Sequence, residues 1–551
     1  MTSTFITTTS VESGIRIQLA AAGDLVAVIQ GVTYGSDNER VIYGAFGNHS
    51  VIVEGSVISG FQSAMELYVG NNEVMIGAAG SVRSSGPTGG YSNLSLFGNN
   101  NFLTNQGTIA SGAGIAATFF GGSSTVVNSG AISGGEIGLF LTNGNSNTVI
   151  NSGIIEGGTV GPFGTRGGIV ASGEAHLIVN SGVIRSNGFG ADAIDLTGGG
   201  TGEIGQSVIH NSGSILSANG IGVSFQFYGT GNTVRIENYG LISGGAVAVS
   251  ATDAADVVVN AGTMHGGVIL RDGADLYDGI GGVVYGVIDG GAGDDVYRIS
   301  DPLALLGEIA AGGTDRVEAM VSWSLLPNSE IEHLTLLGSS ALDGTGNTVG
   351  NELRGNLGDN RLFGLTGADT IHGGNGEDLL DGGLNNDLAY GGNGDDVLRG
   401  RGGDDRIDGG SGDDVAWGAS GNDRLIGDDD DDLLIGGGGR DQLTGGNDFD
   451  TFAYLRTSDS GTTVATRDVI NDFVSGTDVI DLSNLDARQG GTNDAFVFIG
   501  AAVFSSVAGQ LRFKISGVNV IVEGDVNGDA VADFSIVVAA TAAMVAGDFV
   551  L

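Results

Sequence analysis

Aspartate recurs at every ninth residue in the second half of this chain. Residues 346–453 divide without a gap into twelve nine-residue units. In ten consecutive units the sixth residue is aspartate, and the eighth is usually large and apolar. The ten aspartates are Asp369, Asp378, Asp387, Asp396, Asp405, Asp414, Asp423, Asp432, Asp441 and Asp450. Carboxylates at a fixed spacing are suited to binding a hard metal ion, so the pattern predicts metal-binding chemistry.

Each unit indicates a glycine-rich turn followed by a very short strand. Glycine permits the positive φ angles of the turn, and the apolar eighth residue points into a narrow core. Two units then complete one flattened coil, so aspartates of alternate units stack about 4.8 Å apart along one edge. At an effective dielectric constant near 20, unit charges at that distance repel by several kcal/mol. We therefore expect the stack to close only around a cation.

Calcium is the cation that suits this array best. It accepts about six to eight oxygen ligands in a flexible geometry, so carboxylates from successive coils and turn carbonyls can share each ion. The segment contains 23 acidic residues and 7 arginines, a net charge of −16 that about eight Ca²⁺ ions would cancel. Asn351 and Asn360 replace aspartate in the first two units, which are predicted to be caps. A solvated acidic linker is the alternative, but it does not require this strict register.

The array and the tail after it resemble the carboxy-terminal region of RTX proteins, including the secreted serralysin-type proteases. The tail begins with strands such as "RDVINDFVSGTDVIDLSNLDA" and ends in "AGDFVL". In that family a β-roll precedes a small β-domain, and an uncleaved carboxy-terminal signal is read by a type I exporter. The resemblance implies calcium binding, the type I secretion apparatus as a partner, and an extracellular location. It does not extend to proteolysis, because the sequence has no H-E-x-x-H motif.

Two short segments outside the array leave two interpretations open. "DVNGDAVAD" places Asp525, Asn527, Asp529 and Asp533 at positions 1, 3, 5 and 9 of an EF-type loop, but Ile536 occupies position 12. It predicts either a hairpin turn or a further calcium site. "GGAGDDVY", residues 290–297, is a lone nonapeptide-like unit. It is either a capping turn or, through Asp294 and Asp295, a site for one ion.

The amino-terminal half repeats more loosely, around phrases such as "NTVINSGIIEGG". Three short strands recur in every 22 to 31 residues, which predicts a parallel β-helix. An asparagine recurs at the same place in successive repeats and is expected to form a hydrogen-bonded stack at one corner. These asparagines are Asn128, Asn151, Asn180, Asn211, Asn238 and Asn260.

The β-helix alone does not decide between a spacer or adhesin and an enzyme that acts on acidic polysaccharide, such as a lyase or epimerase. An enzyme would need a base and cationic groups. The candidates are Arg166, His176, Arg185, His210, Tyr228, Arg235, Tyr239 and His265. His176 and His210 occupy similar places in their repeats and are expected to lie near one another. No catalytic constellation stands out, so the non-catalytic reading is favoured.

Composition excludes several classes of partner and location. The chain of 551 residues has 64 acidic and 21 basic residues and a net charge of −43, so nucleic acid and anionic membrane are poor partners. It has no cysteine and therefore no disulfides. No run of about 20 apolar residues predicts a membrane span. The start of the sequence has no pattern of a cleaved signal peptide.

Together these observations predict an all-β protein in four parts. Residues 1–285 form a parallel β-helix, 286–345 a junction of capping strands, 346–453 a calcium-binding parallel β-roll, and 454–551 a small β-domain with a type I secretion signal. We expect a secreted protein that has Ca²⁺ as its cofactor and folds when it binds calcium after export. A surface or matrix polysaccharide is its expected further partner.

Overall fold

The structure is a computed structural model that describes most of the chain. The described residues are 3–6, 10–11, 17–19, 21–36, 40–60, 62–85, 92–158, 167–197, 205–226, 231–308, 312–488, 493–539 and 543–551. The chain forms two compact units, residues 1–313 and 314–551. The boundary falls inside the segment that was expected to join the two solenoids. We call them unit 1 and unit 2.

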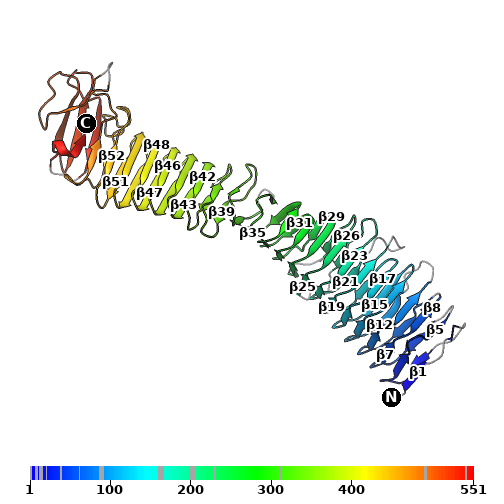
Figure 1. Ribbon diagram of the computed structural model, residues 1–551. Helices are drawn as coiled ribbons and strands as arrows, with labels where there is room; N and C mark the ends of the chain where they lie inside the picture. Colours follow the sequence, from blue (N-terminus) through cyan, green and yellow to red (C-terminus); the bar gives the residue numbers. More distant parts are fainter. Residues whose placement is uncertain are drawn as a thin grey trace. The chain divides into compact units, whose positions relative to one another are not determined.

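Unit 1 is a parallel β-helix with three strands in each coil. One coil consists of β13 (Phe102–Asn105), β14 (Thr108–Ser111) and β15 (Ile115–Phe120). The next consists of β16 (Thr125–Asn128), β17 (Ala131–Gly134) and β18 (Leu139–Thr142). Each strand pairs in parallel with the strand at the same place in the next coil, as Figure 1 shows. The predicted fold class is confirmed.

The strands of unit 1 lie on three faces. Most strands of the first face end at the corner where the recurring asparagines lie. Its strands are β1 (Ser3–Ile6), β4 (Leu25–Val28), β7 (Ser50–Val53), β10 (Glu73–Ile76), β13, β16, β19 (Thr148–Asn151), β22 (Leu177–Asn180), β25 (Gln206–Asn211), β28 (Thr233–Asn238), β30 (Val257–Asn260), β32 (Leu276–Gly279) and β35 (Val296–Ile299). Towards the end of the unit, β29 (Leu241–Ser250) and β31 (Thr263–Asp272) each span both other faces. The coils become shorter there.

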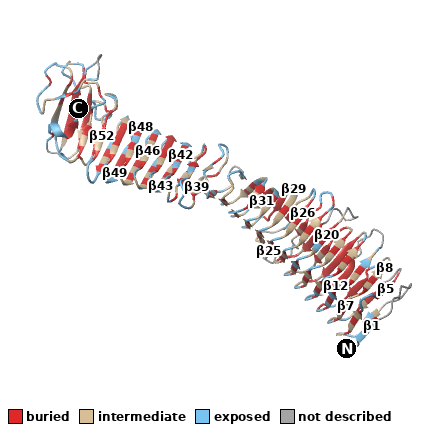
Figure 2. Cartoon of the chain, in the orientation of Figure 1, coloured by how far each residue is buried: buried red, intermediate tan, exposed pale blue. Residues whose placement is uncertain are grey.

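The core of unit 1 is a set of stacked apolar side chains. Along each first-face strand, inward-pointing residues alternate with outward-pointing ones, and Figure 2 shows this alternation of burial. Val126, Val149, Ile178, Ile209 and Ile236 occupy matching places in consecutive coils and are completely buried. Each coil thus buries its apolar residues only by stacking on its neighbours.

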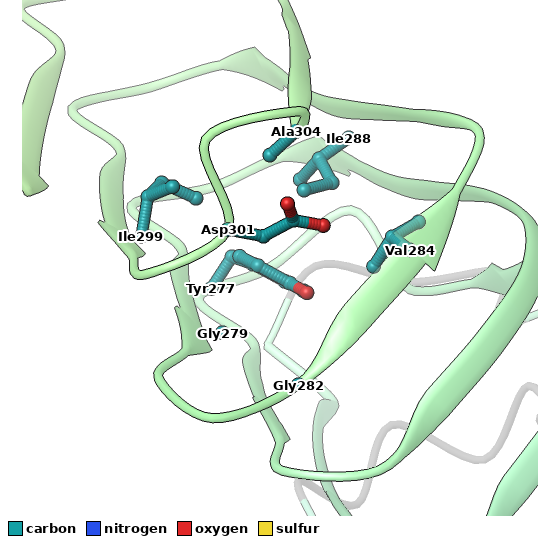
Figure 3. A pocket seen from close by; sticks show the side chains of 8 residues that line it. All are labelled: Tyr277, Gly279, Gly282, Val284, Ile288, Ile299, Asp301 and Ala304. Carbon is teal, nitrogen blue, oxygen red and sulfur yellow. The ribbon is translucent and has the colours of Figure 1, made fainter. Parts of the chain in front are cut away.

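The predicted asparagine stack is present at one corner of unit 1. The Nδ2 atom of each asparagine donates to the Oδ1 atom of the next, at 2.7 to 2.8 Å, from Asn105 to Asn260. The sequence interpretation missed Asn105. At the far end, Asn260 Nδ2 donates to the hydroxyl of Tyr277 at 3.4 Å. Tyr277 and Asp301 point into a small cavity of about 10 Å³, shown in Figure 3, which has room for no more than a water molecule.

Unit 2 begins with β37 (Arg316–Ala319), β38 (Trp323–Ser324) and β39 (His333–Leu336) and continues as a two-sided roll. One side of the roll consists of β41 (Glu352–Arg354), β43 (Thr370–Asn375), β45 (Leu388–Asn393), β47 (Arg406–Ser411), β49 (Arg424–Asp429) and β51 (Gln442–Gly446). The other consists of β40 (Asp343–Thr345), β42 (Arg361–Thr366), β44 (Leu379–Leu384), β46 (Val397–Gly402), β48 (Val415–Ser420), β50 (Leu433–Gly438) and β52 (Thr451–Ala453). Partners in neighbouring coils are 18 residues apart, so two nonapeptide units make one coil. The residues at the eighth position are buried, including the small Ala389 and Ala416.

A small β-domain follows the roll and continues both of its sides. β53 (Val469–Ile470) pairs with β51, and β54 (Val479–Asp481) pairs with β52. The hairpins of β56 (Gln510–Ser516), β57 (Asn519–Asp525) and β58 (Phe534–Val538) are antiparallel, and β58 joins β53. A short 3₁₀ turn, η1 (Ala546–Asp548), leads into β59 (Phe549–Val550), which pairs with β54. Within the described residues, no helix has the length and apolarity needed to cross a membrane.

Candidate calcium centre

The ten predicted aspartates form two stacked ladders in the turns of the roll. The backbone N–H of each aspartate donates to Oδ1 of the aspartate one coil further on, usually 18 residues later in the sequence. For example, Asp396 donates to Asp414 at 2.7 Å, and Asp387 donates to Asp405 at 2.9 Å. One ladder precedes the strands β43 to β51 and the other precedes β44 to β52. The sequence therefore placed alternate units on the same edge correctly.

The second carboxylate oxygen is what sets these aspartates apart. All ten side chains are at most 3% exposed. In each of them Oδ2 is buried and has no hydrogen-bond donor from the protein. A buried carboxylate oxygen without a donor is costly, because burial removes the water that would otherwise solvate its charge. Twenty stacked oxygens, half of them without a donor, therefore form an arrangement that a hard cation completes.

Burial and mutual repulsion raise the pKa values of these carboxylates. Desolvation is the largest cause throughout, and for most of these residues the charges of nearby aspartates add to it. The pKa rises to about 6 for Asp369, Asp378 and Asp441, and to about 8 for Asp432. For Asp387, Asp396, Asp414, Asp423 and Asp450 it rises to about 7, and for Asp405 it is also raised. Each ladder thus resists ionisation of its own members unless a cation is present.

Glycine at the first position of each unit makes room for the carboxylate. A Cβ atom placed on any of the ten glycines would lie 2.0 to 2.5 Å from Oδ2 of the aspartate five residues later. At Gly400 it would lie 2.2 Å from Asp405 Oδ2. This contact is much shorter than van der Waals distance, so the buried aspartate side chain would have to shift. The glycines are therefore required by the site as well as by the turn.

Gly400→Ala is accordingly expected to raise the calcium concentration at the midpoint of folding and to destabilise the roll by roughly 1–3 kcal/mol, as overpacking does. Gly402→Ala is the matched control. A Cβ atom at Gly402 meets nothing closer than 3.6 Å, and its backbone does not have a positive φ. Calcium titrations followed by circular dichroism compare the two variants. Equal midpoints for both would contradict this role for Gly400.

The ladders extend beyond the predicted residues at both ends. The N–H of Asp441 donates to Asp468 Oδ1 at 2.9 Å, and that of Asp450 donates to Asp478 Oδ1 at 3.3 Å. Both added aspartates begin a D-V-I sequence, the same aspartate and apolar spacing that the repeats have, and this signal was overlooked. At the other end, Asn351 and Asn360 donate to Asp369 and Asp378 at 2.7 and 2.6 Å. Neutral amides therefore begin each ladder, at the two units predicted to be caps.

The loop at 525–533 is the turn of the antiparallel hairpin β57–β58. Asp525 accepts hydrogen bonds from the N–H groups of Gly528 and Ala530, one on each carboxylate oxygen. Asp533 Oδ2 accepts from the N–H of Val526 at 2.7 Å. The hairpin interpretation is confirmed, and these carboxylates are partnered within the loop itself.

The candidate catalytic residues of unit 1 do not converge. His176 is buried beside Ser207, to whose Oγ its N–H donates, and burial lowers its pKa to about 4. His210 is three residues further along the face, opposite Val179, and its partly exposed ring lies 2.8 Å from Glu237. The expectation that the two histidines lie at equivalent places was wrong, because His176 precedes Asn180 by four residues whereas His210 precedes Asn211 by one.

The remaining candidates lie on different faces or outside the described residues. Arg235 pairs with Glu237 on the first face, whereas Arg185 pairs with Glu156 on another. The His265 ring stacks on Tyr285, and Tyr239 is exposed. Arg166 and Tyr228 are outside the described residues. Among the described candidates, each charged group is thus held by a local partner rather than directed to a common groove.

The fold and the site define a class of protein, the parallel β-solenoids that end in a carboxylate-lined roll. Residues 354–389, 382–416, 390–425 and 417–452 match the family model of the RTX calcium-binding nonapeptide repeat, in four copies. Residues 354–452 are therefore an array of RTX repeats, which are calcium-binding. The sequence prediction of this repeat and of its ion is confirmed.

One solved structure that the chain resembles is the AlgE6R3 subunit from the Azotobacter vinelandii mannuronan C5-epimerase. The match has 24% sequence identity and a TM-score of 0.18, and it covers 30% of this chain and 78% of that one. No curated protein sequence matches the chain.

Proposed function

We propose that this is a secreted protein whose second unit folds when it meets calcium outside the cell. The observation that supports this most strongly is the pair of buried aspartate ladders, in which Oδ2 of all ten predicted residues has no donor from the protein. We assign these ten aspartates as calcium ligands, with Asp468 and Asp478 extending the ladders. Carbonyl oxygens of the glycine turns supply further ligands.

The difference in calcium concentration across the cell envelope explains why unit 2 would fold only after export. Inside the cell, free calcium is too low to occupy sites of the extracellular class, which bind at about 10⁻⁴ to 10⁻³ M. The aspartate carboxylates of each ladder then repel one another. Unit 2 therefore stays unfolded and can be threaded through an exporter. Outside the cell, calcium binding supplies the free energy of folding, as it does in other metal-dependent domains.

The proposed export signal is accessible only before folding. Asp548 is fully buried, and its carboxylate accepts hydrogen bonds from Ser475 Oγ, at 2.8 Å, and from the N–H of Val545, at 2.7 Å. Phe549 and Val550 form β59, which is paired with β54. An exporter that reads these residues must therefore engage the chain before the β-domain forms, which agrees with folding after transport.

Secretion from a bacterium that carries a type I exporter tests this proposal. The full chain is expected in the medium, whereas a chain that ends at Val545 is expected to stay in the cells. An exporter with an inactive ATPase is the control for leakage. Secretion of both chains through the active exporter would contradict the assignment of this segment as the signal.

For unit 1 we propose a non-catalytic role at the cell surface or in the extracellular matrix. Its corner is a ladder of amides, and its partly exposed aromatic rings stack on each other, with Tyr68 and Phe97 at 4.2 Å and Phe97 and Phe120 at 4.4 Å between ring centroids. Stacked rings stiffen unit 1 and leave little exposed ring surface on which a sugar could stack. Unsaturated ends released from an acidic polysaccharide by the purified protein would overturn this role and support a lyase.

A further inference from the structure

The last coils of unit 1 have the turn geometry of the roll, although the family match begins only at residue 354. Arg271 and Gly273 have φ angles of 82° and 134°, and Arg401 and Gly403 in the roll have 75° and 135°. Gly291 and Gly293, one coil later, have 98° and 134°. Asp256, Asp275 and Asp295 each directly precede a first-face strand. They are 19 and 20 residues apart, close to the 18 of the roll.

The stacking of these turns also matches that of the roll. A Cβ atom at Gly293 would lie 1.7 Å from the carbonyl oxygen of Gly273, and one at Gly421 would lie 1.6 Å from that of Gly403. Both values mean that the backbone of one turn lies directly against the carbonyl oxygen of the turn one coil earlier. The N–H of Asp275 donates to Asp295 Oδ1 at 2.8 Å, within the range of the roll ladders.

Further upstream in unit 1, residues that directly precede the first-face strands form the same hydrogen bond without charge. There the N–H of Asn72 donates to Asn101 Oδ1 at 3.1 Å, and that of Ser124 donates to Asn147 Oδ1 at 2.9 Å. An amide oxygen is therefore sufficient for the stacking of coils. The change from amide to carboxylate at the end of unit 1 requires another explanation, because a buried charge is costly where a neutral group would serve.

The carboxylates that precede the last first-face strands differ in how many of their oxygens accept a hydrogen bond. Asp256 is buried, but its Oδ1 accepts from the N–H of Val234 and its Oδ2 from the N–H of Thr252, each at 2.7 Å. Asp275 is only 2% exposed, and its Oδ1 accepts from the N–H of Asp256 at 2.6 Å. Its Oδ2 is buried and has no donor, as in the ten roll aspartates. This oxygen indicates where a cation is needed.

Another buried carboxylate lies one coil later, and the nearby arginine is engaged elsewhere. Asp295 follows one coil later and is 1% exposed, and a carboxylate oxygen of Glu308 lies within 4.8 Å of one of Asp295. Arg271, in the same turn as Asp275, contacts Asp253 at 3.6 Å and Ser250 Oγ at 2.9 Å. One difference from the roll is Leu270, which stands where each roll unit has glycine, whereas Gly290 retains it.

We propose that unit 1 binds a Ca²⁺ ion at the corner formed by the turns 271–275 and 291–295, with Asp275 and Asp295 as its carboxylate ligands. Carbonyl oxygens of the two stacked turns complete the oxygen ligands. The site pairs Asp275 with Asp295 across coils, in place of the adjacent Asp294 and Asp295 suggested by the sequence; Asp294 is exposed. The ion would fasten the end of the β-helix independently of the roll.

Hydrogen exchange of the full chain, with calcium and with chelator plus magnesium, tests the site. In the wild type we expect calcium to slow exchange of the amides at 271–276 and 291–296 by on the order of tenfold or more. Asp275→Asn should abolish that change, since it keeps the Oδ1 acceptor and removes the charge. Asp272→Asn, at an exposed residue of the same turn, is the control and should respond as the wild type does.

The same samples separate this site from the roll. Peptides from 354–452 report calcium binding there and should respond equally in all three proteins. Absence of a calcium response at 271–276 in the wild type, while the roll responds, would overturn the unit 1 site and leave the proposed function intact. A response in Asp275→Asn equal to that of the wild type would also overturn it, because protection would then be transmitted from elsewhere.

Discussion

Asp396→Asn combined with Asp414→Asn is expected to lower the calcium affinity of the roll on the order of tenfold or more, because ligand charge sets affinity in oxygen sites. These residues are neighbours in one ladder, and asparagine keeps the Oδ1 acceptor of the 2.7 Å hydrogen bond between them. The variant should also be more stable than the wild type in chelator, since two buried, mutually repelling charges are gone. Calcium titration calorimetry measures the loss of affinity, and circular dichroism in chelator, where the variant should show more order than the wild type, measures the second effect, which has the opposite sign.

Asp395→Asn combined with Asp413→Asn is the matched control. These aspartates precede the ladder residues by one position, are exposed, and are joined by a hydrogen bond of 3.0 Å. The variant has the same net charge as the ladder variant. If both variants lost calcium affinity equally, the effect would be one of general charge, and the ladder would not be the binding site.

Lowering the pH is expected to act in opposite directions with and without calcium. In chelator, the folded pKa of most ladder aspartates is raised to between about 6 and about 8, above the ordinary value. Their protonation therefore favours the folded form, so the stability of metal-free unit 2 should rise as the pH falls from about 8 towards about 4. With calcium, protons and Ca²⁺ compete for the same carboxylates. Unit 2 in chelator is unfolded near pH 7 and its carboxylates have ordinary pKa values, so the calcium midpoint should change little between pH 8 and pH 6 and should rise as the pH falls towards about 4.

Calcium midpoints at pH 8, 6 and 4, followed by circular dichroism, check the competition, and circular dichroism of the chain in chelator at the same pH values checks the metal-free trend. The ladder variant should show a weaker pH dependence than the wild type, whereas the exposed control should not. If lowering the pH from 8 to 4 in chelator did not favour the folded form, the result would contradict the buried ladders, because the raised pKa of their carboxylates requires that protonation stabilise the fold.

Strict periodicity made the roll predictable from sequence. With nine residues per unit and two units per coil, residue number alone places Asp387 next to Asp405, and the apolar eighth position fixes the side that faces the core. Asp468 and Asp478 were missed because the period changes where they join the ladders. They follow their partners by 27 and 28 residues instead of 18. A longer connection changes the residue count without changing the stacking.

The β-helix was predictable in its corner and not in its faces. Asn151 and Asn180 lie opposite each other because each coil keeps the phrase around its corner asparagine, whatever the length of its loops. His176 and His210 were misplaced although the phrase shows their register, because His176 precedes its corner asparagine by four residues and His210 precedes its own by one. The turn at 271–275 was overlooked because its sequence departs from the repeat. Its conformation is that of the roll, but Leu270 and Arg271 replace two glycines of the repeat.

Hydrogen exchange of the full chain in saturating calcium and in excess chelator, near pH 7.5, tests the central claim most directly, that the order of the roll is conditional on the ion. We predict that amides at 354–452 exchange slowly in calcium and close to the rate of an unfolded chain in chelator. Amides in the coils at 102–158 should remain protected in both conditions. Slow exchange at 354–452 in the presence of chelator would contradict the account, because the aspartate ladders would then close without a cation.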